Sequence, residues 1–132
     1  MAARLDETAK GVFIIAATPF TDSGAVDYDS VDSLTDFYIS CGVHGFTLLG
    51  MMGEAHKLTP DESLAVVKRV IARAGGRKVI VGVSHAAIDP LRRLSHEVMA
   101  AGAAGVMVAP AAGLKGDDAL YGYYKQVFEA LG

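Results

Sequence analysis

The chain has 132 residues, of which 52% are hydrophobic and 20% charged, and its formal net charge at pH 7 is −3. We expect residues 1–132 to form a single domain with a hydrophobic core, well short of the roughly 250 residues of a closed eight-stranded α/β barrel. Because twelve basic residues are scattered among fifteen acidic ones, the composition argues against binding to nucleic acid or to an anionic membrane.

The amino terminus and the lone cysteine predict a cytoplasmic protein. Residues 1–10 carry four charges before any apolar run, so they lack the hydrophobic stretch of a signal peptide and are expected to strap onto the first strand. The weakly polar region 103–114 is too short to span a bilayer. Cys41 has no partner for an intrachain disulfide, and we expect it to be a small core residue rather than a nucleophile.

Four short apolar runs without polar alternation predict four strands buried on both faces, as in a parallel sheet. They comprise residues 12–17, 46–49, 79–83 and 106–109. A helical pattern follows each run, so strand and helix alternate four times.

The first two helices have clear start signals. In the first, Asp27 or Asp29 is the predicted cap, and apolar side chains recur at Val31, Leu34, Tyr38 and Cys41. In the second, Thr59 caps, Pro60 takes the first helical position and Glu62 closes a capping box. Its buried stripe is predicted at Leu64, Val67, Ile71 and Ala74.

The last two helices complete the pattern. Asp89 and Pro90 repeat the order of cap and proline, Gly102 is the predicted stop, and one face carries Leu91, Leu94, Val98 and Ala101. The fourth helix is predicted from about Asp117, with apolar residues in register at Leu120, Tyr124, Val127 and Leu131. The chain is therefore predicted to be a (βα)4 unit of the α/β class.

A faint internal repeat supports this fold. Cys41–Gly45 and Ala101–Gly105 each end a helix with glycine and enter a four-residue apolar strand, as expected where alternate strands of a barrel share a packing role. Four parallel strands leave two unpaired edges and a concave apolar face, which invite pairing. Self-association, membership of a longer chain and an open sandwich of the flavodoxin type all remain possible.

The most informative segment runs from Gly45 to Glu54 and reads GFTLLGMMGE. We interpret it as a buried strand and a glycine-hinged turn, followed by the capped helix, which is where α/β enzymes place their sites. Backbone N–H groups of the turn Gly50–Gly53 can receive a small carboxylate or phosphate. A tight connection in which Glu54 bonds nearby backbone explains the turn equally well.

Together with Ala17-Thr18-Pro19-Phe20 upstream, this segment resembles the dihydrodipicolinate synthase and N-acetylneuraminate lyase family, and the chain corresponds to the amino-terminal half of that family. The resemblance implies half of a TIM (β/α)8 barrel, commonly homo-oligomeric. It also implies reversible aldol addition or cleavage of pyruvate or a related 2-oxo acid, without metal or organic cofactor. The family's Schiff-base lysine and relay tyrosine lie on the sixth and fifth strands, outside this chain.

The chain departs from the family at the turn itself. The family normally has Gly-Thr-Thr-Gly-Glu there, and its hydroxyls help to hold the pyruvate carboxylate and relay a proton, whereas this chain has Met51 and Met52. Backbone anion binding could survive this change, but proton relay by those side chains could not. A family tyrosine is likewise replaced at Ala112. The resemblance assigns substrate binding to Thr18, Gly50, Met51, Met52, Gly53 and Glu54 and leaves the catalytic residue unknown.

Other polar residues are weaker candidates. Lys57 and Lys115 lie near the expected mouth of the barrel, but their loop contexts lack the burial that activates an amine. His56 and His85 follow strand ends and could form an acid–base pair, although loop roles are favoured, and no histidine has metal-ligand spacing. Ser84 is a supporting candidate, and packing roles are expected for Tyr121, Tyr123 and Tyr124.

These observations predict the amino-terminal half of an aldolase-type lyase whose aldehyde substrate the sequence leaves open. The alternative is a noncatalytic half barrel that assembles with itself or with a partner and retains at most an anion-binding turn. The loss of both threonines and the missing strands support that alternative.

Overall fold

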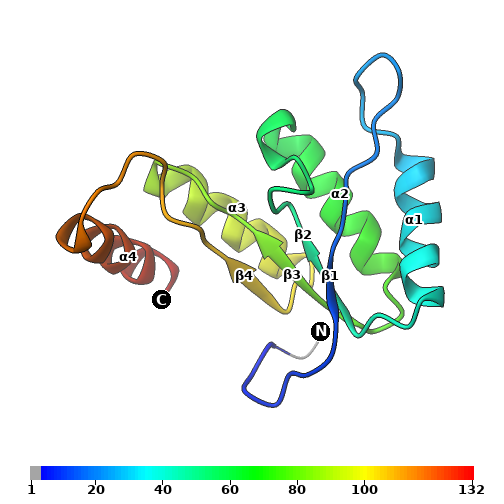
Figure 1. The fold of residues 1–132 in the computed structure, drawn as a ribbon, viewed down its shortest axis with the longest axis horizontal. Coiled ribbons are helices and arrows are strands. Elements are labelled where there is room, and N and C mark those ends of the chain that lie inside the picture. Colours follow the sequence, from blue (N-terminus) through cyan, green and yellow to red (C-terminus); the bar gives the residue numbers. More distant parts are fainter. Residues whose placement is uncertain (1–3) are drawn as a thin grey trace.

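The structure, a computed structural model, describes residues 4–132, and these form one sheet of four parallel strands (Figure 1). Each strand pairs with its neighbour in sequence, so β1 and β4 are the edges. The strands are β1 (Phe13–Ile15), β2 (Gly45–Leu48), β3 (Lys78–Gly82) and β4 (Gly105–Met107).

A helix follows each strand, and the helices pack against one another in chain order (Figure 1). They are α1 (Tyr28–Ser40), α2 (Pro60–Arg73), α3 (Ile88–Ala100) and α4 (Asp117–Leu131), with a short 3-10 helix η1 (Ala55–Lys57) before α2. A flavodoxin-type sandwich would place β1 inside the sheet and helices on both faces. The strand order β1-β2-β3-β4 therefore excludes that alternative and confirms the (βα)4 half barrel.

The hydrophobic core lies between the sheet and the helices. One cluster joins strand and helix side chains, and those that are at most 2% exposed include Phe46, Leu48, Val67, Val79, Val81, Leu91 and Val98. Because side chains alternate between the two faces of a strand, the opposite face carries Ile15, Ile80 and Met107. Ile15 and Met107 are 47% and 43% exposed, so this concave face is apolar and open.

The starts of α1 and α2 are confirmed, and that of α3 is corrected. Asp27 accepts a hydrogen bond from the Ser30 N–H, and the capping box of Thr59 and Glu62 is complete. The cap of α3 is Ala87 rather than Asp89. The helix begins two residues earlier than predicted, which leaves Asp89 in its first turn, where the carboxylate pairs with Arg92 at 2.6 Å.

Two other predictions are wrong. Cys41 is exposed: it is the cap residue that follows the last turn of α1, and the buried residues of this helix are Val31 and Thr35. The amino-terminal segment is not confined to the first strand but reaches the opposite edge of the sheet. There the Leu5 N–H donates to the carbonyl oxygen of Ala104, next to β4, at 2.8 Å.

The internal repeat corresponds to a shared way of ending a helix. Gly42 and Gly102 both have a positive φ, 84° and 107°. The residue after each glycine donates its N–H to a carbonyl one turn back in the helix, from Val43 to Tyr38 and from Ala103 to Val98. This Schellman-type geometry requires a residue that tolerates the left-handed region, which explains the glycine in both copies.

Candidate functional site

The turn after β2 consists of two overlapping hydrogen-bonded turns. The Gly53 N–H donates to the Gly50 carbonyl, and the Glu54 N–H donates to the Met51 carbonyl, both at 3.1 Å. Among the hydrogen bonds of residues 4–132, none uses the N–H of Met51 or Met52. Two backbone donors at the carboxyl end of β2 are therefore available to an anion.

Thr18 ties this turn to the end of β1. Its side chain is 6% exposed, and its hydroxyl donates to the Gly53 carbonyl oxygen at 2.7 Å. Gly53 is closely packed, because a Cβ there would lie 3.1 Å from the Leu49 nitrogen and 3.2 Å from the Ala16 oxygen, and these atoms would have to shift slightly to accept it. The structure thus brings two of the predicted site residues together.

Leu49 and Gly82 also shape the turn, and sequence reasoning missed both. Leu49 has a φ of 57°, a left-handed conformation that costs a non-glycine residue roughly 1–2 kcal/mol. Its carbonyl oxygen lies over β3, where a Cβ on Gly82 would approach it to 2.5 Å. A glycine within the apolar run 79–83 was an available signal, because a strand glycine often marks a close backbone approach.

The other glycine of the turn is less constrained. A Cβ on Gly50 would lie 3.5 Å from Ile15 Cγ2 and 4.0 Å from Met107 Cε, so a side chain has room there and the expected glycine hinge is confined to Gly53. The same distances show that the apolar concave face continues beneath the turn. Met51 and Met52 are 94% and 66% exposed.

Glu54 leads into η1 with a φ of 51° and forms an ion pair with Lys57. The hydrogen bond from Lys57, reinforced by its positive charge, lowers the pKa of the Glu54 carboxyl. Lys57 is 58% exposed, so it lacks the burial that activates an amine for imine formation. Lys115, in the loop before α4, is also exposed.

The two candidate histidines have loop roles. His56 is exposed on η1, and His85 Nδ1 accepts the Ala87 N–H at 2.9 Å at the start of α3. Neither lines a cavity found in the described part of the chain. Ser84 Oγ accepts the Ala109 N–H at 2.8 Å and so links the ends of β3 and β4.

The three tyrosines of α4 differ in their surroundings. Tyr123 is buried, its hydroxyl donates to the His85 carbonyl at 3.0 Å, and burial raises its pKa. Tyr124 donates to the Val108 carbonyl at 3.1 Å. Packing roles are therefore confirmed for these two, whereas Tyr121 is 74% exposed.

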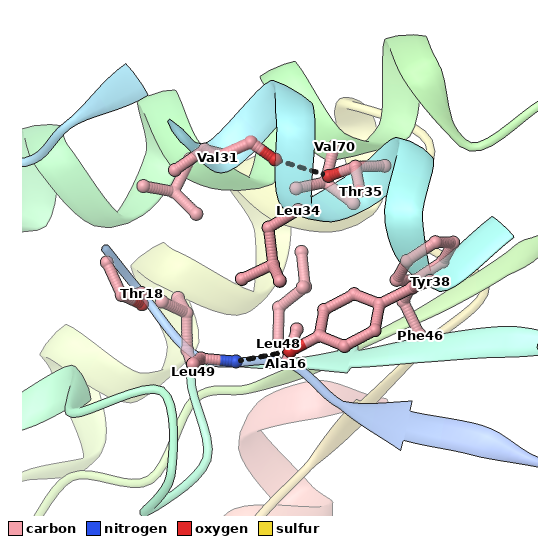
Figure 2. A pocket seen from close by; sticks show the side chains of 12 residues that line it. Ala16, Thr18, Val31, Leu34, Thr35, Tyr38, Phe46, Leu48, Leu49 and Val70 are labelled. Atoms are coloured by element: carbon pink, nitrogen blue, oxygen red, sulfur yellow. Dashed lines mark hydrogen bonds between the residues drawn. The ribbon is translucent and has the colours of Figure 1, made fainter. Parts of the chain in front are cut away.

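A small cavity lies behind the site, between the sheet and helices α1 and α2 (Figure 2). Its volume is about 10 Å³, and Thr18, Leu34 and Tyr38 are among the residues that line it. Such a volume holds one water molecule at most, so the cavity is too small for an organic ligand. Within residues 4–132, no group of histidine, cysteine and acidic residues could hold a metal ion, and no helix is long and apolar enough to cross a membrane.

A parallel half barrel with a constrained, amide-lined turn at the carboxyl end of β2 corresponds to half of a (βα)8 enzyme scaffold, whose sites lie at that end of the strands. Residues 8–132 match the Dihydrodipicolinate synthetase family, and the chain belongs to that family. Both the predicted family and the predicted fold are thereby confirmed.

Individual relatives agree with this assignment. The chain is 41% identical over 100 residues to a 4-hydroxy-tetrahydrodipicolinate synthase of Sorangium cellulosum, a match that covers 74% of this chain and 33% of the relative. Dihydrodipicolinate synthase from Rhodopseudomonas palustris superposes with a TM-score of 0.93 and 48% identity, over 98% of this chain and 43% of that one.

A third relative was solved with a ligand. YagE, a prophage protein of the dihydrodipicolinic acid synthase family from Escherichia coli, is in complex with pyruvate, and it superposes with a TM-score of 0.81 at 29% identity over 91% of this chain and 41% of its own. The chain therefore spans less than half the length of the relatives described here.

Proposed function

We propose that this chain contributes the pyruvate-binding half of an aldolase-type lyase, with the imine-forming lysine supplied by strands outside it. The observation that carries the proposal is the turn after β2, which offers two unused N–H groups at the position where the family resemblance places carboxylate binding. Support also comes from YagE, a relative in complex with pyruvate. The proposed binding residues are Thr18, Gly50, Met51, Met52, Gly53 and Glu54.

These residues have separate roles in the proposal. The N–H groups of Met51 and Met52 donate to the carboxylate of the 2-oxo acid. Thr18 and Gly53 hold those groups in place through their hydrogen bond, and Gly50 leaves space above the concave face. Glu54 holds the last part of the turn in place through its ion pair with Lys57.

A lysine outside the chain fits the exposure of the lysines within it. In the described residues, each lysine is exposed or partly exposed, and the least accessible one, Lys78, has a side chain that is 24% exposed and lies at the amino end of β3. A Schiff-base lysine needs a desolvated amine close to the bound substrate. None of the six meets both conditions.

The proposal is tested by titrating the ¹⁵N-labelled chain with pyruvate and following the amide signals of residues 50–54. We expect saturable shifts at Met51 and Met52. The Gly53→Ala variant should lose them, because the added methyl group displaces the turn. The matched variant Gly122→Ala should keep them, since it adds the same methyl group where nothing beyond the neighbouring backbone of its own helix lies within 4 Å.

Borohydride reduction in the presence of pyruvate, followed by intact mass measurement, tests the origin of the lysine. We expect no adduct on the chain alone. An adduct on Lys57 or Lys115 would contradict an external lysine. The absence of saturable shifts from a folded chain would instead favour the noncatalytic half barrel.

A further inference from the structure

The amino ends of the strands, opposite the proposed pyruvate site, form a second cleft. It has a volume of about 700 Å³ and lies between the segment entering β1, the loop before β2 and the loop before β3. The cleft is shallow and largely open to solvent. Its cationic and imidazole side chains are Lys10, His44, Arg77 and Lys78.

Arg77 is held in the cleft without an acidic partner. It is half-buried, and its Nε and Nη1 donate to the carbonyl oxygens of Val43 and Ala74 at 3.0 and 3.2 Å. Within residues 4–132, no carboxylate lies within 4.0 Å of Arg77 or Lys10. A partly buried guanidinium is ordinarily paired, and it presents donors that suit carboxylate and phosphate.

Other arginines of this chain show the paired arrangement. Arg69 and Arg73 each donate two hydrogen bonds to one carboxylate, at distances of 2.7 to 2.9 Å. The carbonyl oxygens that hold Arg77 fix its position but do not neutralise its charge. An anionic ligand would supply the missing counter-charge.

His44 fixes the wall that carries Lys10. Its Nδ1 accepts the Val12 N–H at 2.9 Å, so in the neutral ring the proton is on Nε2, which is left as a donor. The ring lies directly against Gly11, where an added Cβ would come within 2.3 Å of Cγ. The segment entering β1 therefore packs against the imidazole ring of His44.

The acidic groups near the cleft do not cancel its charge. Asp6 accepts hydrogen bonds from the backbone N–H and hydroxyl of Thr8 and lies 3.9 Å from Lys78 Nζ, so its carboxylate offsets one of the three positive charges and leaves those of Lys10 and Arg77 uncompensated. The remaining wall includes Phe13, which offers an apolar surface, and the glycines Gly42, Gly75 and Gly76. The cleft thus combines excess positive charge with room for an organic group.

We propose that this cleft binds a small anion with at least two negative charges, of the phosphate or polycarboxylate class. Lys10, Arg77 and Lys78 contact the charged groups, and His44 Nε2 donates a further hydrogen bond. The cleft lies at the opposite ends of the strands from the turn after β2, so the proposal is independent of pyruvate binding there.

The test is calorimetric titration of the whole chain with inorganic pyrophosphate, citrate and acetate at constant ionic strength, with ¹⁵N spectra in parallel. We expect pyrophosphate or citrate to bind saturably and to shift the amides of Gly75 and Gly76, with acetate at least roughly tenfold weaker. Pyrophosphate as the tighter ligand assigns the phosphate class, and citrate as the tighter ligand assigns the polycarboxylate class.

Two double variants separate a built site from general charge. Lys10→Gln with Lys78→Gln should weaken binding by roughly tenfold or more. Lys68→Gln with Lys125→Gln makes the same change in net charge on exposed faces of α2 and α4 and should leave the affinity within about twofold. If the first double variant fails to fold, Lys10→Gln alone serves in its place. This substitution removes no ion pair and should also weaken binding.

The proposal is overturned if neither polyanion binds saturably, or if both double variants weaken binding to the same extent. It is also overturned if the shifted amides lie at residues 50–54 instead of the cleft. Pyruvate binding at the turn should be unchanged in Lys10→Gln, so failure of one proposal leaves the other testable.

Discussion

Thr18 connects two segments that are 35 residues apart, because its buried hydroxyl donates to the Gly53 carbonyl oxygen. This bond fixes the end of the turn whose free N–H groups belong to Met51 and Met52. A threonine hydroxyl at the end of β1 therefore positions a binding surface that it does not itself have to contact.

We predict that Thr18→Val lowers the free energy of unfolding by about 1–3 kcal/mol, because the buried carbonyl loses its partner while side-chain volume is nearly kept. Urea denaturation followed by circular dichroism measures this loss. The pyruvate-induced shifts at the turn should weaken in the same variant.

Thr35→Val is the matched control. Thr35 is 3% exposed, and its hydroxyl donates to Val31, one turn earlier in α1. That carbonyl lies within the helical hydrogen-bond ladder, so we expect a loss below about 1 kcal/mol. Equal losses in the two variants would contradict a special role for Thr18.

At the scale of elements, a ladder of ion pairs joins α1 to α2. Arg69 and Arg73 bind Asp32 and Asp36 through paired hydrogen bonds, and Arg73 also approaches Asp32 at 3.3 Å. These bonds lower the pKa values of both carboxyl groups. Because each pair joins positions 37 residues apart, the ladder fixes how the two helices align.

We predict that this ladder makes the fold acid-sensitive. A carboxyl group whose pKa is lowered by folding contributes its full stabilisation above the unfolded value, here 3.8, and loses it as pH falls through the lower folded value. Thermal unfolding midpoints measured between neutral pH and pH 3 should therefore drop in the acidic range.

Asp32→Asn should flatten that acidic drop, because it removes a group that takes up a proton on unfolding. Asp22→Asn, in the loop before α1, serves as the control, since Asp22 has no ion pair among the described residues. An acidic drop of the same slope in both variants would contradict this role for Asp32.

At the scale of the whole molecule, the open concave face and the two edge strands are the features that bear on association. We propose that the chain is one domain, supported by its single core cluster, and that it associates with itself. Ile15 and Met107 leave an apolar surface uncovered, and the outer edges of β1 and β4 have no partner strand in the described residues. Such faces and edges favour association.

We predict that sedimentation shows concentration-dependent association and that Ile15→Lys reduces it, because a charge on this edge opposes burial of the concave face. Phe37→Lys is the control. Phe37 is 59% exposed but lies on α1, away from that face, so its replacement should leave the association unchanged. Equal effects of the two variants would point to general surface hydrophobicity instead.

Much of the fold follows from local signals. The capping box of α2 was predictable because Thr59 and Glu62 are three residues apart and meet within one helical turn. The start of α3 was not predictable in this way. Asp89 and Pro90 have the same order of cap residue and proline, but the helix begins at Ile88, after a loop in which His85 accepts the Ala87 N–H. Local signals therefore predict the existence of a helix better than they predict its first residue.

The sequence by itself determined the alternation of strands and helices, the glycine-ended helices and the family to which the turn belongs. These depend on residue periodicity and on neighbours within one turn of the chain. Only the tertiary structure decided that Thr18 reaches Gly53, that Leu49 lies over Gly82 and that Arg77 lines a cleft in which no described carboxylate pairs with it. The physical reason is that each of these contacts joins residues far apart in sequence, which meet only once parallel strands are aligned.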